Sequence, residues 1–123
     1  MDNILLDSVI VIDHFNGVAA ATSYLKKTEG YCSISVITRA EILTGFDAHQ
    51  AERALPLLNR FPVFEIDVAA ADRAAELRRA HRWRIPDAFQ AAIAQLHQIK
   101  FATRNIRDFP PGTFDFVIIP YAI

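Results

Sequence analysis

The chain of 123 residues is short of cysteine, because Cys32 is its one thiol. A disulfide within the chain is therefore excluded, which favours the reducing cytoplasm. A set of Cys and His residues with zinc-site spacing is also missing. No apolar run approaches the roughly 20 residues of a membrane span, and the N-terminus lacks the basic leader of a signal peptide. We therefore expect a soluble, cytoplasmic protein with no membrane partner.

An excess of positive charge is missing too. Thirteen Lys and Arg residues stand against fourteen Asp and Glu residues, giving a formal net charge of -1. Binding of nucleic acid by bulk charge alone is therefore excluded, and any such binding must be local. Repeats, low-complexity segments and linkers are absent as well, so we expect residues 1–123 to form a single domain. Hydrophobic residues make up 52% of the chain, including nine Phe, and supply a core.

Short apolar segments alternate with helix-forming segments along the chain. The apolar segments predict five strands, at 3–7, 31–37, 63–68, 100–105 and 114–121. The segments between them predict helices at 17–27, 38–46, 49–61, 69–83 and 86–99. Alternation of this kind is typical of right-handed β-α-β units. It predicts an α/β fold with a parallel sheet covered on both faces.

Asp7 is a charged residue inside the otherwise apolar stretch "NILLDSVIVIDHF". A carboxylate in a buried element is costly unless it is paired or binds a metal. In open parallel sheets, ligands bind outside the carboxyl ends of the strands, and Asp7 ends the first predicted strand. Asp7 therefore needs a partner at that edge of the sheet.

Three further acidic residues can reach the same edge. Glu41 lies in the helix after the second strand, Asp87 opens the helix that starts at Pro86, and Asp108 follows the fourth strand. Carboxylates that converge repel one another unless a divalent cation lies between them. Ligation by oxygen alone suits Mg²⁺ or Mn²⁺ better than zinc. The four acids together predict a metal site.

Each of these acids also has a plainer interpretation. Asp87 could favour the positive end of its helix, Glu41 could be an exposed helix residue, and Asp108 could be a turn residue. Asp7 is the hardest to explain in this way, because its flanks are apolar on both sides.

Four motifs, "LLDSVIVIDHF", "TRAEILTG", "IPDAFQAAIA" and "TRNIRDF", occur in this order along nearly the whole chain. In order and spacing they resemble the PIN-domain ribonucleases, most closely the VapC toxins of toxin–antitoxin pairs. The chain departs from the family at Val9, where Asn or another small polar residue is common.

The resemblance implies a three-layer α/β/α sandwich with a central parallel sheet of about five strands. It implies a Mg²⁺ or Mn²⁺ site that is also catalytic, and cleavage of RNA phosphodiester bonds by metal-activated water. It also implies inhibition by a cognate antitoxin, and we expect a homodimer. The ligands would be Asp7, Glu41, Asp87 and Asp108, with Ser8, Thr103 and Asn105 as candidates for hydrogen-bond support of these ligands.

One basic segment stands out in a chain of balanced charge. "ELRRAHRWR" carries four arginines beside a tryptophan, and we consider them as RNA-binding candidates: Arg78, Arg79, Arg82, Trp83 and Arg84. The alternative is a solvated helix face with Trp83 in the core or in a dimer contact. Asp13 also has two interpretations, support of the metal site or a solvated helix end, and the pattern favours the solvated one.

Two other functions remain open at this stage. A non-catalytic or weakly active PIN-like binding module could use the same acidic pocket to receive an Arg or Lys from a partner, and Val9 favours it. A stand-alone RNA-processing nuclease would share the chemistry but not the antitoxin.

Overall fold

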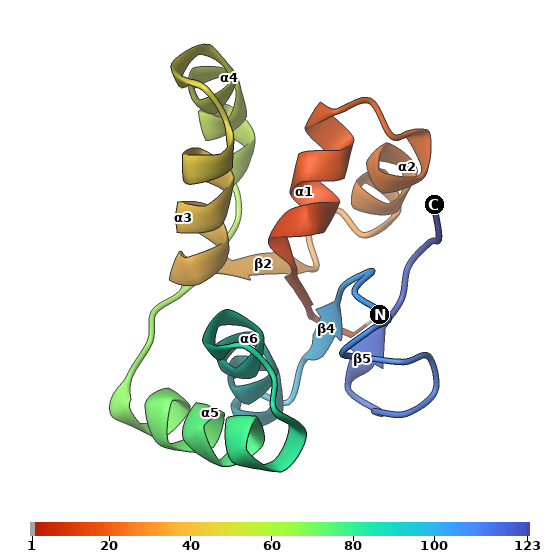
Figure 1. The fold of residues 1–123 in the computed structure, drawn as a ribbon. Coiled ribbons are helices and arrows are strands. Elements are labelled where there is room, and N and C mark those ends of the chain that lie inside the picture. Colours follow the sequence, from red (N-terminus) through yellow and green to blue (C-terminus); the bar gives the residue numbers. More distant parts are fainter. Residues whose placement is uncertain (1) are drawn as a thin grey trace.

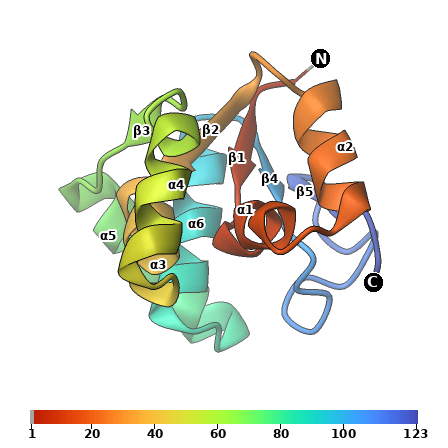
Figure 2. The same ribbon diagram turned by 90° about the horizontal axis from the view of Figure 1, so that it is seen from above.

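The computed structural model describes residues 2–123. Five short strands pair side by side, all parallel, in the order β3-β2-β1-β4-β5 (Figures 1 and 2). Their bounds are β1 Ile4–Leu6, β2 Cys32–Ser35, β3 Val63–Phe64, β4 Lys100–Ala102 and β5 Val117–Ile118. The prediction of a parallel sheet of about five strands is confirmed.

Six helices cover the two faces of this sheet. They are α1 Ser8–Phe15, α2 Ala19–Lys27, α3 Val36–Gly45, α4 Ala48–Leu58, α5 Val68–His81 and α6 Ile85–Leu96. In Figures 1 and 2 the first four helices lie on one side of the sheet, and α5 and α6 pack together on the other. The fold is therefore the expected α/β/α sandwich, and no helix within residues 2–123 is long and apolar enough to cross a bilayer.

The central strand β1 explains why the sheet needs both layers. Successive side chains of a strand point to opposite faces. Leu5 packs with α5, α6 and Phe101, whereas Ile4 and Leu6 pack with the helices of the other layer. All three side chains are at most 2% exposed. A strand that is apolar at every position is thus buried on both faces.

All five strands are shorter than the sequence predicts, and after β2 and β3 a polar side chain caps the following helix. The Ser35 hydroxyl accepts a hydrogen bond from the Thr38 amide at 3.1 Å, so α3 begins at Val36 instead of after Ile37. The Asp67 carboxylate caps α5 in the same way, by accepting from the Ala70 amide at 2.9 Å. Capping stabilises a helix start by about 1 kcal/mol and here outweighs the β propensity of the apolar residues.

Candidate active site

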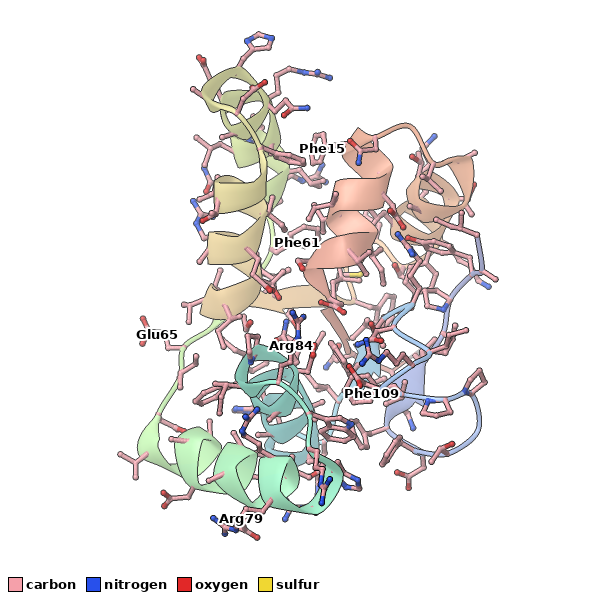
Figure 3. The ribbon with its side chains drawn as sticks, in the orientation of Figure 1. Phe15, Phe61, Glu65, Arg79, Arg84 and Phe109 are labelled. Carbon is pink, nitrogen blue, oxygen red and sulfur yellow. The ribbon has the colours of Figure 1, made fainter. Side chains whose placement is uncertain are left out.

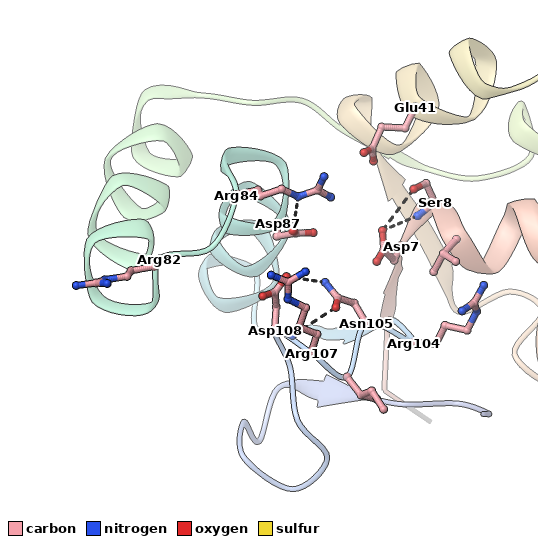
Figure 4. A pocket seen from close by; sticks show the side chains of 12 residues that line it. Asp7, Ser8, Glu41, Arg82, Arg84, Asp87, Arg104, Asn105, Arg107 and Asp108 are labelled. Carbon is pink, nitrogen blue, oxygen red and sulfur yellow. Dashed lines mark hydrogen bonds and ion pairs between the residues drawn. The ribbon is translucent and has the colours of Figure 1, made fainter. Parts of the chain in front are cut away.

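The four acidic residues singled out in the sequence line one cavity of about 660 Å³ at the carboxyl ends of the strands. Each comes from a different segment: Asp7 between β1 and α1, Glu41 from α3, Asp87 from the first turn of α6, and Asp108 from the loop after β4. Figure 4 shows their side chains around the same space. The parallel topology therefore brings together residues that are up to 101 positions apart in the sequence.

Asp7 is held by hydrogen bonds to both of its carboxylate oxygens. The Ser8 amide donates to Oδ1 at 2.8 Å, and the Thr103 hydroxyl donates to Oδ2 at 2.6 Å. The Ser8 hydroxyl lies 3.5 Å from Oδ1. Asp7 also precedes α1 directly, as its N-cap. These contacts fix the orientation of the Asp7 carboxylate.

Asp108 is held by its own loop. The Asn105 side-chain amide donates to Oδ2 of Asp108 at 2.9 Å, and the Asp108 amide lies 3.3 Å from the Asn105 side-chain oxygen (Figure 4). The Asn105 amide in turn donates to the Thr103 hydroxyl at 3.1 Å. Thr103 and Asn105 therefore connect Asp7 to Asp108 through a chain of hydrogen bonds.

The environment of the pocket opposes negative charge. Burial raises the pKa of Asp7 to about 6, and the charges of Asp87 and Glu41 add to the rise. Burial also raises the pKa of Glu41, partly offset by the Ser8 hydroxyl. The pKa of Asp87 is raised by burial as well, and Arg84, whose Nε lies 3.4 Å from Asp87, lowers it in part. Acids with raised pKa values in one cavity are typical of a functional site.

The donor types of the pocket fit a hydrated divalent cation. Within residues 2–123, no three His, Cys, Asp or Glu side chains are grouped closely enough to hold one ion by themselves. Mg²⁺ does not require such a cage, since it keeps several waters and takes one or two carboxylates together with substrate phosphates. The lining contains carboxylates but neither His nor Cys, and this ligand set suits Mg²⁺ or Mn²⁺.

Comparison with known proteins agrees with this geometry. The family model of the PIN domain matches residues 4–110. Ribonuclease VapC10 of Mycobacterium tuberculosis strain H37Rv is 32% identical over 98% of this chain and 94% of its own length. The chain belongs to the PIN-domain family.

Solved structures agree with the PIN fold. A chain from a toxin–antitoxin complex from Klebsiella pneumoniae superposes with a TM-score of 0.91 and 34% identity, over 98% of this PIN domain and all of that chain. A chain of DNA-bound VapBC from Salmonella typhimurium superposes with a TM-score of 0.77 and 20% identity, over 96% of this domain and 98% of that chain. The second likeness shows the fold alone.

The basic segment of this PIN domain is divided by the structure. Arg82 and Arg84 line the pocket, although Figure 4 shows the Arg82 guanidinium pointing outward. Arg78 donates to the Trp83 carbonyl at 2.6 Å, and Arg79 lies on the outer side of α5 (Figure 3). The segment is therefore not one continuous RNA path, and Arg79 does not belong to the pocket.

Two arginines that sequence reasoning missed also line the pocket, Arg104 and Arg107. They come from the same loop as Asp108, and Figure 4 places Arg107 on the Asp108 side and Arg104 on the α1 side. Within residues 2–123 Arg107 has no ion-pair partner. The signal was present in "TRNIRDF", where both residues lie within the motif, but only the fold shows which way they face.

Trp83 is a core residue of this PIN domain. Its side chain is 3% exposed and packs between the rings of His81, Phe109 and Phe114, with centroids 4.3, 4.6 and 5.3 Å away. Its indole nitrogen donates to the Asp108 carbonyl at 3.1 Å. No face of the indole is left for an RNA base, so Trp83 is removed from the RNA-binding candidates.

The solvated interpretation of Asp13 is wrong. Asp13 is 5% exposed and accepts two hydrogen bonds from the Arg104 guanidinium, at 2.7 and 3.0 Å. The Tyr121 hydroxyl donates to the same carboxylate at 2.8 Å. The Arg104 guanidinium is the main cause of the lowered pKa of Asp13. Asp13 therefore holds Arg104, an arginine of the pocket. Its two partners, Arg104 and Tyr121, lie 91 and 108 residues further along the chain.

Proposed function

We propose that this chain is a Mg²⁺- or Mn²⁺-dependent endoribonuclease, acting as one nuclease domain over residues 1–123 and as the toxin of a type II toxin–antitoxin pair. The observation that carries the proposal is the convergence of four carboxylates and several arginines on one pocket. The resemblance to a ribonuclease over almost the full length of both chains supports the reaction. The single, buried thiol of Cys32 supports a reducing cytoplasm as its location.

In this mechanism Asp7 and Asp87 would hold the cation, and Glu41 and Asp108 would either hold a second ion or orient a water by hydrogen bonds. A bound divalent cation supplies a nucleophilic water at neutral pH and neutralises charge on the phosphate. Ser8 and Thr103 keep the Asp7 carboxylate in place by hydrogen bonds. Since neither His nor Cys lines the described pocket, the protein side of the reaction depends on carboxylates.

Removal of the metal tests the reaction. The purified protein is incubated with a fluorescent single-stranded RNA in Mg²⁺ or Mn²⁺, with and without EDTA. We expect cleavage with either metal, loss of cleavage in EDTA, and recovery when excess Mn²⁺ is added. Cleavage that continues in EDTA would contradict the metal-dependent mechanism.

A non-catalytic binding module is the second candidate, and two observations favour it. Val9 lines the pocket where the family commonly has a polar residue, and Arg84 already pairs with Asp87. Such a module would accept a basic side chain of a partner in the pocket. Mn²⁺ binding without RNA cleavage would support the binding module over the enzyme. The absence of both Mn²⁺ binding and RNA cleavage would support it as well.

We also propose an antitoxin partner and a homodimer. The structural neighbour from Klebsiella pneumoniae belongs to a toxin–antitoxin complex, which supports the antitoxin. Apolar side chains left exposed, such as Val63 and Val68, support a further interface. Sedimentation of the isolated chain at micromolar concentration tests the dimer, and a purely monomeric boundary would contradict it.

The arginines of the pocket are expected to bind RNA phosphates. Replacing both Arg84 and Arg107 by Ala should weaken RNA binding and reduce the salt slope of log K by about 1 to 2, because fewer counterions are released. Arg79→Ala is the control for an arginine outside the pocket, since it removes one positive charge from the outer side of α5. Affinity measured at several salt concentrations checks this, and equal slopes in the double variant and the control would refute the assignment.

A further inference from the structure

Three buried polar side chains form one hydrogen-bond network beneath the acidic pocket. Ser35, Thr38 and Gln90 are each at most 1% exposed, and none of them lines the cavity. The Ser35 hydroxyl donates to the Gln90 side-chain oxygen at 2.8 Å, and the Gln90 amide donates to the Thr38 hydroxyl at 2.5 Å. The Thr38 hydroxyl donates onward to the Leu6 carbonyl, at 3.4 Å.

The members of this network sit next to the acids in the sequence. Thr38 precedes Glu41 by three residues on α3, and Gln90 follows Asp87 by three residues on α6. Side chains three apart on a helix share a face, one turn from each other. Leu6, whose carbonyl accepts from Thr38, directly precedes Asp7. The network therefore joins β1, α3 and α6 one turn or less from Asp7, Glu41 and Asp87.

These three segments belong to different layers of the fold. Helix α6 packs on one face of the sheet and α3 on the other (Figure 1). Apolar packing within each layer does not by itself set the distance between α3 and α6 at the edge of the sheet. Hydrogen bonds between the helices can set this distance, because their donor–acceptor distances and angles vary only within narrow limits. The Gln90 amide spans from α6 to α3 at this edge.

Stability alone gives no reason for polar residues at these positions. A buried hydrogen bond contributes little net stability, and replacing both partners by apolar groups of the same shape can be nearly neutral. A fully satisfied buried network does specify one arrangement of the elements that it joins. Three carboxylates at one edge need such a constraint, since their charges push the segments apart.

We propose that Thr38 and Gln90 are positioning residues, whose hydrogen bonds set the separation of Asp7, Glu41 and Asp87 for cation binding. This inference rests on the proposed function, in which these carboxylates bind Mg²⁺ or Mn²⁺. Neither residue touches the cation or the RNA. Ser35 supports both of them but also caps α3, so its replacement would combine two effects.

The test uses substitutions that keep shape and remove hydrogen bonds. Thr38→Val and Gln90→Met are expected to weaken Mn²⁺ binding by about tenfold and to lower kcat more than they change KM. Thr38→Ser retains the hydroxyl and should stay within about twofold of the parent protein. Mn²⁺ affinity is measured by isothermal titration with the metal alone, and cleavage with the same RNA as above, below the melting temperature of each variant.

A matched control separates positioning from stability. Thr28 is another buried threonine, 2% exposed, whose hydroxyl donates to the Tyr24 carbonyl at 2.7 Å at the end of α2, away from the pocket. Thr28→Val should lower the melting temperature as Thr38→Val does, yet bind Mn²⁺ as the parent protein. Parent-like Mn²⁺ affinity and kcat in both Thr38→Val and Gln90→Met, with only the melting temperature lowered, would overturn the proposal.

Hydrogen exchange on the metal-free protein makes this test independent of activity. Thr38→Val should speed exchange at the amides of Asp7 and Ser8 more than Thr28→Val does, because the β1–α3 link is lost. A parent protein that neither binds Mn²⁺ nor cleaves RNA would defeat the proposed function. The exchange comparison would still test whether Thr38 positions the Asp7 segment. Equal exchange rates in Thr38→Val and Thr28→Val would overturn that role.

Discussion

Asp7→Asn is expected to abolish RNA cleavage and, in the absence of metal, to make the protein more stable. Loss of a proposed carboxylate ligand should cost several kcal/mol of transition-state stabilisation, which lowers the rate by at least about 10³-fold. The gain in stability arises because burial and the charges of Asp87 and Glu41 raise the pKa of Asp7 to about 6. At neutral pH the folded protein must carry this unfavourable charge.

The raised pKa of Asp7 also predicts how the stability of the metal-free protein changes with pH. The pKa of Asp7 is higher in the folded than in the unfolded chain, where it is near 3.8, so the folded state binds more protons between pH 4 and 6. The stability of the metal-free protein should therefore fall as the pH rises through this window, by up to about 3 kcal/mol. Asp7→Asn should reduce this loss of stability with rising pH.

Urea unfolding between pH 4 and pH 7 in EDTA measures this effect. Asp72→Asn, at an exposed position of α5, is the control for loss of one negative charge. Added Mg²⁺ should stabilise the parent protein more than the Asn variant, because a ligand stabilises the state that binds it. An Asn variant that is less stable than the parent at pH 7 in EDTA, or one that still cleaves RNA, would contradict the assignment of Asp7.

Trp83→Ala is expected to destabilise the fold by about 3 to 5 kcal/mol, the cost of removing a large aromatic side chain from a core. The loss should also release the Asp108 carbonyl from its hydrogen bond with the indole. Trp83→Phe should cost less, because a ring still fills the space between His81 and Phe109. Thermal melting and urea titration measure both variants.

This outcome separates the two interpretations of the basic segment. If Trp83 stacked on a base, Trp83→Ala would lower RNA affinity by about 1 to 3 kcal/mol and leave the melting temperature unchanged. If Trp83 packs in the core, Trp83→Ala should instead lower the melting temperature and leave the RNA affinity unchanged. An Ala variant with the stability of the parent and weakened RNA binding would show that the indole leaves the core to reach RNA.

The sequence predicts the acidic part of the pocket well, because its signal is local. Asp7 stands out inside an apolar stretch of sequence, and the other acids lie in a helix after a strand, open a helix or follow a strand: Glu41, Asp87 and Asp108. A parallel sheet carries all such positions to one edge, so the residues can be assigned without knowing any contact distance.

The basic and supporting parts of the site depend on contacts that local patterns do not contain. Asp13 looks like a helix-end residue until Arg104 and Tyr121, from distant segments, are placed beside it. Gln90 looks like an ordinary polar residue of an Ala-rich helix until Thr38 is seen opposite. The sequence around Trp83 is compatible with an exposed or a buried side chain. The contacts with the Phe109 and Phe114 rings, which come from a distant segment, show that it is buried.

The junctions between strands and helices at the pocket have almost no length. Helix α1 begins two residues after β1 ends at Leu6, and α3 begins immediately after Ser35. One inserted residue at either junction would turn the following helix by about 100° about its axis, because a helix has 3.6 residues per turn. Insertions and deletions among related chains should therefore avoid these junctions and gather where the chain turns far from them, as at Gly17 and Gly112, both at positive φ.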